Sequence, residues 1–208
     1  MTTVTDVFIT VLSYVACALT YMLIFIPIYG AARYLYLRKN GKTSVIDAKY
    51  EILLFAFVMY CIGLASLTIL PGVGGVENYR IEFLADEIIL VPFTVLRHTF
   101  ANLTKGYYGL FFINFLGNII VFVPLGFFIS KIFRISLWKT ALIGLCISLF
   151  IEVSQLFIAG RRSDIDDLWL NSFGALIGGA ITEVAKKRGK TQVSKIRQKK
   201  GQTDKWTT

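Results

Sequence analysis

The chain has 208 residues, of which 55% are hydrophobic and 17% are charged, and its formal net charge is +9. A soluble domain of this length carries more charge and fewer apolar side chains, so this balance excludes an ordinary soluble protein.

Long uncharged stretches identify the chain as a membrane protein. Residues 7–32, 52–76 and 106–130 contain no charged side chain, and each exceeds the roughly 20 residues that a helix needs to cross a bilayer. Lipid offers no partner to backbone N–H and C=O groups, so these stretches are predicted to be helices. With two weaker candidates, we expect an all-α polytopic bundle in the cell membrane with five crossings: residues 7–29, 51–70, 108–130, 139–159 and 164–185.

Lys and Arg gather in three regions, residues 33–49, 131–139 and 186–208. In a five-span chain these regions fall on one side, which the positive-inside rule makes cytoplasmic, with the N-terminus outside. We predict a first span with its basic loop (1–50), a membrane domain (51–185) and a disordered basic tail (186–208). The tail carries a single aromatic residue, so we expect it to be a topology anchor or a partner for anionic lipid head groups and not to bind nucleic acid.

Residues 71–107 are too long for a simple connector and too apolar for a solvated loop. Their apolar part, IILVPFTVL (88–96), is interrupted by Pro92 and is too short to cross the bilayer. We expect it to lie in the outer interface or to dip partway into the membrane. It is either a lid over the helices or a segment that packs on their outer end, and His98 just after it is expected to be a surface residue.

The last two spans are joined by a short turn and form a helical hairpin whose polar residues can be placed by counting. At 1.5 Å per residue, Glu152 should lie level with Asn171, and Gln155 level with Asp167, in the outer half of the membrane. Ser148 continues the Glu152 face one turn deeper, and Asp164, Asp167, Asn171, Gly174 and Gly178 form one stripe of the fifth span. Ser163 is predicted to cap that helix, and Asp166 is placed on a different side of it.

The third span is the predicted partner of this stripe. Asn114 and Asn118 share one of its faces, and Pro124 leaves the carbonyl of Ile120 free for another donor. Arg161 and Arg162, in the turn, are expected to balance the acids. Polar groups at this depth normally face the bundle interior or a wet cavity. The sequence therefore predicts a ligand site of Asn118, Glu152, Gln155, Arg161, Arg162, Asp164, Asp167 and Asn171.

Helix adhesion is the alternative role for such residues, and we expect it for Asn114, Gly174 and Gly178, whose small-xxx-small spacing favours close helix contact. The three cysteines lie in apolar runs, so neither a disulfide nor a metal site is expected, and no cofactor is predicted. The oligomeric state stays open.

Several motifs together resemble the VanZ-like membrane protein family. They are GNIIVFVPLGF (117–127), E-x-x-Q (152–155), GRRSDIDDLWLNSFGALIGG (160–179), SLTILP (66–71) and LVPF (90–93). The resemblance covers about residues 55–183. It implies a role in the envelope of Gram-positive bacteria, where founding members are associated with low-level resistance to teicoplanin-type lipoglycopeptides.

Three functions fit these residues. The first is a non-catalytic protein that binds a lipid, a lipid-linked wall precursor or the tail of a lipoglycopeptide, and so lowers antibiotic access. The second is an enzyme acting on a lipid head group, with Glu152 and Asp167 as candidate acid and base. Glu152, Asp164 and Asp167 could also hold a divalent ion. Against an enzyme, Ser163 and Ser172 are expected to lack an adjacent base. The third, a transporter, is disfavoured because five spans show no internal repeat.

Overall fold

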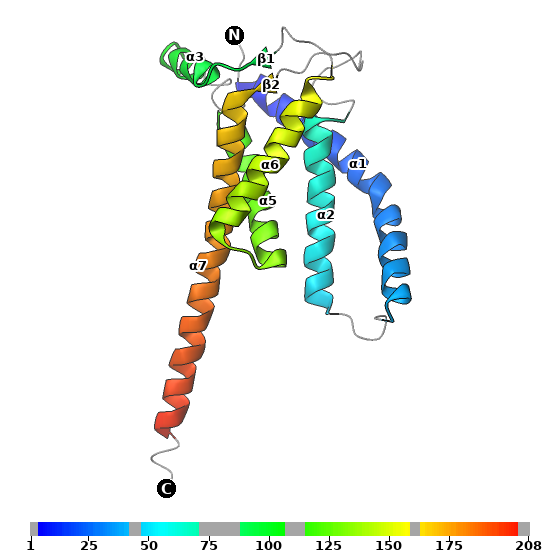
Figure 1. Ribbon diagram of the computed structural model, residues 1–208, viewed down its shortest axis with the longest axis vertical. Helices are drawn as coiled ribbons and strands as arrows, with labels where there is room; N and C mark the ends of the chain where they lie inside the picture. The colour runs from blue at the N-terminus through cyan, green and yellow to red at the C-terminus, as the bar shows by residue number, and fades with distance from the viewer. Residues whose placement is uncertain (1–3, 42–46, 71–87, 107–114, 159–162, 204–208) are drawn as a thin grey trace.

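The computed structural model describes residues 4–41, 47–70, 88–106, 115–158 and 163–203. Within these ranges the chain forms six helices and one short parallel sheet (Figure 1). In chain order the elements are α1 (Val4–Lys39), α2 (Ala48–Thr68), β1 (Ile88–Ile89), α3 (Thr94–Thr104), α5 (Asn118–Phe133), α6 (Leu137–Gln155), β2 (Ser163–Asp164) and α7 (Ile165–Thr203).

Five helices in the described part of the chain are long and apolar enough to cross a membrane. The stretches that qualify are Val11–Lys39, Ala48–Thr68, Phe115–Phe133, Leu137–Gln155 and Ile165–Arg188. The predicted all-α membrane bundle with five spans is therefore confirmed.

The ends of the helices differ from the predicted ones. α1 continues to Lys39, ten residues beyond the expected end of the first span, and α6 ends at Gln155 instead of near residue 159. α7 continues to Thr203, so the tail that we expected to be disordered is helical to that point. Lys, Arg and Gln are good helix formers, which allows a helix to run on beyond its apolar part.

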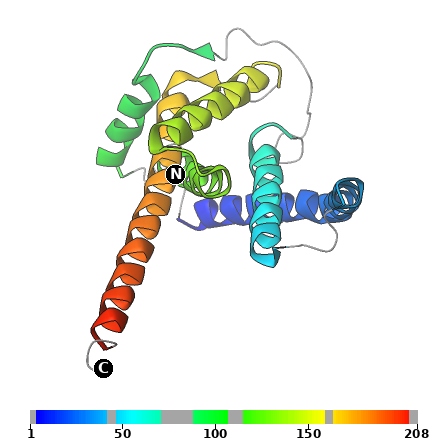
Figure 2. The same cartoon turned by 60° about the horizontal axis from the view of Figure 1, so that its bottom comes forward.

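Successive spans run in opposite directions, which gives the bundle two distinct ends (Figure 1). At one end lie the start of α7, both strands and α3; we call this the acidic end, after Glu152, Asp164 and Asp166. At the other end α1 and α5 finish and α2 and α6 begin; we call this the basic end. The turned view in Figure 2 places α3 beside the start of α7, and α2 packs between α1 and α5.

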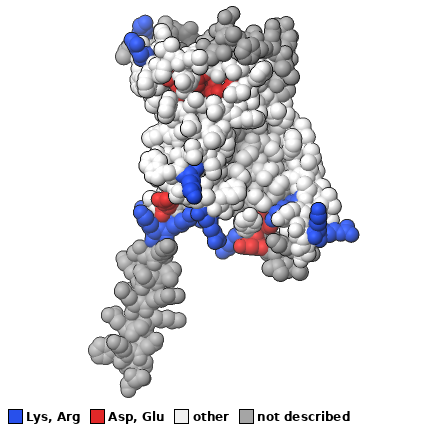
Figure 3. Space-filling view, in the orientation of Figure 1, with Lys and Arg blue, Asp and Glu red and all other residues white. Residues whose placement is uncertain are grey.

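The charges follow this division of the molecule. Figure 3 shows acidic side chains surrounded by uncharged surface at the acidic end, with basic side chains at its edge over α3; towards the basic end Lys and Arg gather together with some acidic side chains. Lys131 at the end of α5, Arg134 between the helices and Lys139 at the start of α6 are exposed there. The predicted basic regions thus share one side of the bundle, as far as the structure describes them.

Small residues let α5, α6 and α7 approach very closely. A Cβ atom on Gly126 of α5 would collide with the backbone carbonyl of Ala175 in α7, and one on Gly144 of α6 would collide with the methyl group of Ala175. Gly174 and Gly178 lie equally close to the backbone of α5. The predicted helix-packing role of these two glycines is confirmed.

α2 contacts α5 near the predicted break in the helical hydrogen-bond pattern. Pro124 lies inside α5, and the hydroxyl of Tyr60 in α2 donates a hydrogen bond to the carbonyl of Val121. We expected the carbonyl of Ile120 to be the free one. The observed acceptor is its neighbour, one residue along the same helix.

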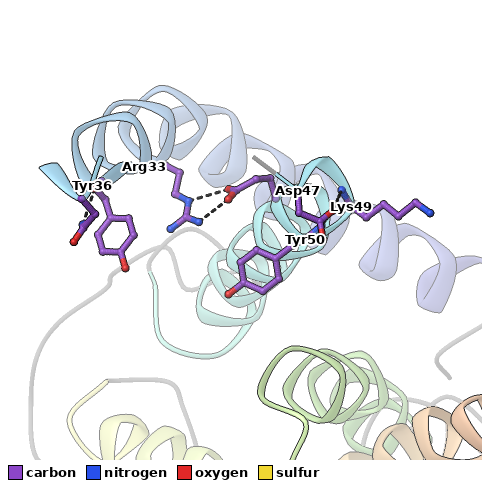
Figure 4. A network of polar contacts seen from close by, with 7 residues as sticks. Arg33, Tyr36, Asp47, Lys49 and Tyr50 are labelled. Atoms are coloured by element: carbon purple, nitrogen blue, oxygen red, sulfur yellow. Dashed lines mark hydrogen bonds and ion pairs between the residues drawn. The ribbon is translucent and has the colours of Figure 1, made fainter. Parts of the chain in front are cut away.

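At the basic end an ion pair joins α1 to α2 (Figure 4). The guanidinium of Arg33 donates to both carboxylate oxygens of Glu51, at 2.8 and 2.6 Å. The carboxylate of Asp47 accepts from the backbone N–H groups of Lys49 and Tyr50 and so caps α2. Residues that bear charge here are therefore paired or solvated at the surface.

Candidate functional site at the acidic end

Glu152 lies in the last turn of α6, and its side chain is buried, with 5% of its surface exposed. One carboxylate oxygen, Oε2, accepts from the hydroxyl of Ser163 at 3.0 Å and from the backbone N–H of Asp164 at 2.8 Å. Both donors belong to β2. Glu152 therefore fixes the short strand that leads into α7.

Asn171 is paired one turn deeper than we predicted. Its amide donates to the hydroxyl of Ser148 at 2.8 Å, and that hydroxyl lies 3.5 Å from the backbone carbonyl of Asp167. The predicted pairing of Glu152 with Asn171 is wrong. α6 ends at Gln155, so Glu152 lies only three residues from the end of its helix, whereas Ser148 lies at the depth of Asn171.

Gln155 has a different partner as well. Its amide donates to the carbonyl of Thr68, the last residue of α2, at 3.1 Å. The predicted level pairing of Gln155 with Asp167 is therefore wrong for the same reason. Gln155 connects the end of α6 to α2.

The predicted meeting of the third and fifth spans is present. The amide of Asn118, the first residue of α5, donates to a carboxylate oxygen of Asp167 in α7 at 2.5 Å. Asn114, Arg161 and Arg162 lie outside the described residues. Their proposed places at the site stay predictions.

The start of α7 is capped by a different residue from the predicted one. Asp164 precedes the first helical residue and accepts from the backbone N–H of Asp166 at 3.0 Å, which is the hydrogen bond of an N-cap. Ser163, which we expected in this role, donates to Glu152 instead. The expectation that Ser163 lacks an adjacent base was wrong, because a carboxylate lies within hydrogen-bond distance of its hydroxyl.

Asp166 has a role that the sequence did not reveal. Only 1% of it is exposed, and its two carboxylate oxygens accept from the backbone N–H groups of Phe93 at 2.6 Å and Leu96 at 3.2 Å. These are N–H groups at the start of α3, which has no side-chain cap of its own. The prediction that Asp166 lies away from the polar stripe of α7 is confirmed, but the sequence did not indicate that α3 packs on that side of the helix.

A parallel sheet ties the same two segments together. Ile88 pairs with Ser163, and Ile89 pairs with Asp164. Residues 88–104 are thus held to the start of α7 by strand pairing and by Asp166. His98 is exposed on α3, as predicted.

Acids and amides from three helices meet in a small volume at this end of the bundle. Within the described ranges, no group of three or more His, Cys, Asp or Glu residues is arranged to hold a metal ion. The side-chain oxygen of Asn171 is buried and has no hydrogen-bond partner among the residues that the structure describes, although buried polar atoms are normally paired.

Comparison with protein families identifies one match. The family described as VanZ/LLP1 matches residues 57–186, which is more than half of the chain and includes every predicted site residue. Neither curated proteins nor solved structures give a match.

Proposed function

Because the chain belongs to the VanZ/LLP1 family, we propose that it binds a lipophilic or lipid-linked ligand at its acidic end. We further propose that this end faces the outside of a bacterial cell membrane and that binding contributes to resistance against teicoplanin-type antibiotics. The ligand classes are a membrane lipid, a lipid-linked wall precursor and the tail of a lipoglycopeptide.

The observation that carries the proposal is the convergence of Asn118, Glu152, Asp164, Asp167 and Asn171 from three helices and a strand. Polar groups are costly inside a membrane protein, and simple adhesion requires few of them. Here they gather near the ends of the spans, which is the level at which a lipid head group lies while its tail remains in the bilayer.

The surroundings of these residues suit an amphiphilic ligand. Val153 of α6 and Trp169 and Phe173 of α7 are exposed apolar side chains within one or two turns of the site. In a membrane such side chains contact acyl chains. A ligand with a polar head and a long tail therefore finds both of its parts matched within a short distance.

The experiment is a susceptibility assay in a Gram-positive host that expresses the chain. Wild-type protein should raise the teicoplanin concentration needed for killing, and Glu152→Gln should lose most of this protection at an equal membrane level. Glu183→Gln is the matched control, because it removes the same charge from α7 far along the helix. Equal protection by wild type and Glu152→Gln would contradict the proposal.

An enzyme acting on a lipid head group is a second candidate, favoured by the hydrogen bond from Ser163 to Glu152. A hydroxyl beside a carboxylate has the arrangement of a nucleophile with its base. Ser163→Ala separates the two candidates, since it removes the nucleophile and leaves the acids in place. Loss of protection with retained ligand binding favours catalysis, whereas retained protection favours binding alone.

A further inference from the structure

The segment before α3 exposes a group of large apolar side chains. Leu90, Val91 and Phe93 have exposed fractions of 69%, 68% and 57%, and together with Pro92 they form what we call the apolar turn. Isolated exposed apolar residues are common, but three of them on one turn indicate a surface with a partner.

The apolar turn is held rigidly at its base. Asp166 binds the backbone N–H of Phe93, and β1, directly before the turn, pairs with β2. β2 is itself bound to Glu152 of α6. The turn is therefore fixed against two membrane-spanning helices.

The backbone of Phe93 supports a role for the exposed ring. Its φ angle is +65°, in the left-handed region that large side chains rarely adopt. Such a conformation is costly for any residue with a side chain and persists where the surrounding structure enforces it. Glycine would adopt it without this cost, so keeping a phenylalanine here implies a use for its ring.

The apolar turn lies at the depth where a membrane surface is expected. Asp166 contacts the turn, and Trp169, three residues further along α7, is about 4.5 Å deeper at the helical rise. Trp169 is exposed, and tryptophan is enriched at the boundary between lipid and water. Arg97 and His98 of α3 are exposed as well, which gives the same segment polar groups for lipid head groups.

We propose that residues 88–104 form an interfacial anchor that inserts Leu90, Val91 and Phe93 into the lipid leaflet at the acidic end. The partner is the lipid surface, because the anchor continues the lipid-facing apolar surface of α7 at Trp169 and Phe173. Asp166 acts as a positioning residue that holds the anchor at this depth. The anchor stands independently of any ligand at the polar site.

The experiment uses full-length protein in phospholipid vesicles with a fluorophore attached to Val91→Cys, after replacement of the native cysteines by alanine. Lys105→Cys, just beyond α3, is the reference position at head-group level. Lipids brominated on their acyl chains should quench the fluorophore at position 91 more strongly than at position 105. Aqueous iodide should show the opposite order.

Two variants distinguish a loss of membrane insertion from a general loss of protein stability. Phe93→Gly relieves the backbone strain, so the protein should unfold at the same or a higher temperature while lipid quenching at position 91 falls. Asp166→Ala should reduce the difference between the two positions by freeing the segment. Lipid quenching at position 91 that does not exceed that at position 105 in the unaltered segment overturns the proposal, whatever iodide does.

Discussion

The two ends of the bundle handle carboxylates in opposite ways. At the basic end Glu51 meets a guanidinium, and both side chains of the pair are 22% exposed. At the acidic end Glu152 is almost fully buried, and the donors found for it among the described residues are a hydroxyl and a backbone N–H. The carboxylate at the basic end is ion-paired and partly exposed, which suits a role in orienting the chain in the membrane. The carboxyl group at the acidic end is buried and hydrogen-bonded to β2, which gives it a role in the fold.

A second pair of residues shows the same difference. Asp47 and Asp166 each accept two backbone N–H groups at the start of a helix. Asp47 caps its own helix at an exposed position, whereas Asp166 caps α3 from a buried position in α7. Matched substitutions of these two residues can therefore measure how much burial adds to the stabilisation that a helix cap provides.

The largest effect is expected for Glu152→Ala. It leaves the hydroxyl of Ser163 and the N–H of Asp164 without their acceptor, and two buried unpaired donors cost roughly 3 kcal/mol of unfolding free energy. Denaturation of the purified protein in detergent measures this loss. A loss no larger than that of Glu51→Ala would remove the distinction between the two ends.

Asp166→Ala ranks second. The N–H groups of Phe93 and Leu96 lose their acceptor, but they lie near the surface and can be partly rehydrated, so about 2 kcal/mol is expected. Hydrogen exchange at the start of α3 should rise sharply, while exchange in the centre of α7 stays slow. Unchanged exchange in α3 would show that strand pairing alone holds the segment.

Asp47→Ala is the exposed counterpart of that change. Loss of an N-cap side chain typically costs about 1 kcal/mol, and water can replace the carboxylate at this exposed position. The same exchange experiment should show faster exchange only in the first turn of α2. A loss equal to that of Asp166→Ala would mean that burial contributes little.

The smallest effect is expected for Glu51→Ala. Partly exposed ion pairs contribute roughly 0–1 kcal/mol, and salt weakens them further. The difference in unfolding free energy from wild type should shrink as salt is added. A loss that is large and independent of salt would place this pair in the class of Glu152.

The sequence predicted some of these features and missed others for physical reasons. Uncharged length was sufficient for three of the five spans, and the two weaker candidates were confirmed as well. Side-chain spacing was sufficient for the meeting of Asn118 with the polar stripe of the fifth span and for the packing of Gly174 and Gly178. The predicted depths of Glu152 and Gln155 were wrong, because they were counted from an α6 end near residue 159, whereas α6 ends at Gln155. In addition, β2 occupies Ser163 and Asp164, so α7 begins one residue later than predicted. Asp166 joins segments that lie 70 or more residues apart in the sequence, and no local pattern reports such a contact.

Whether the acidic end serves a ligand as well as the fold is tested most directly at Asp167. Asp167→Asn keeps the size of the side chain and an oxygen that can accept from Asn118, so the only change is that the carboxyl group becomes an amide. The measurement is binding of a lipid-linked wall precursor to purified protein in lipid nanodiscs, with the unfolding temperature recorded for each variant. The account predicts binding about tenfold weaker, or about 1.4 kcal/mol, at an unchanged unfolding temperature; unchanged binding, or binding that falls only as the protein unfolds, would contradict it.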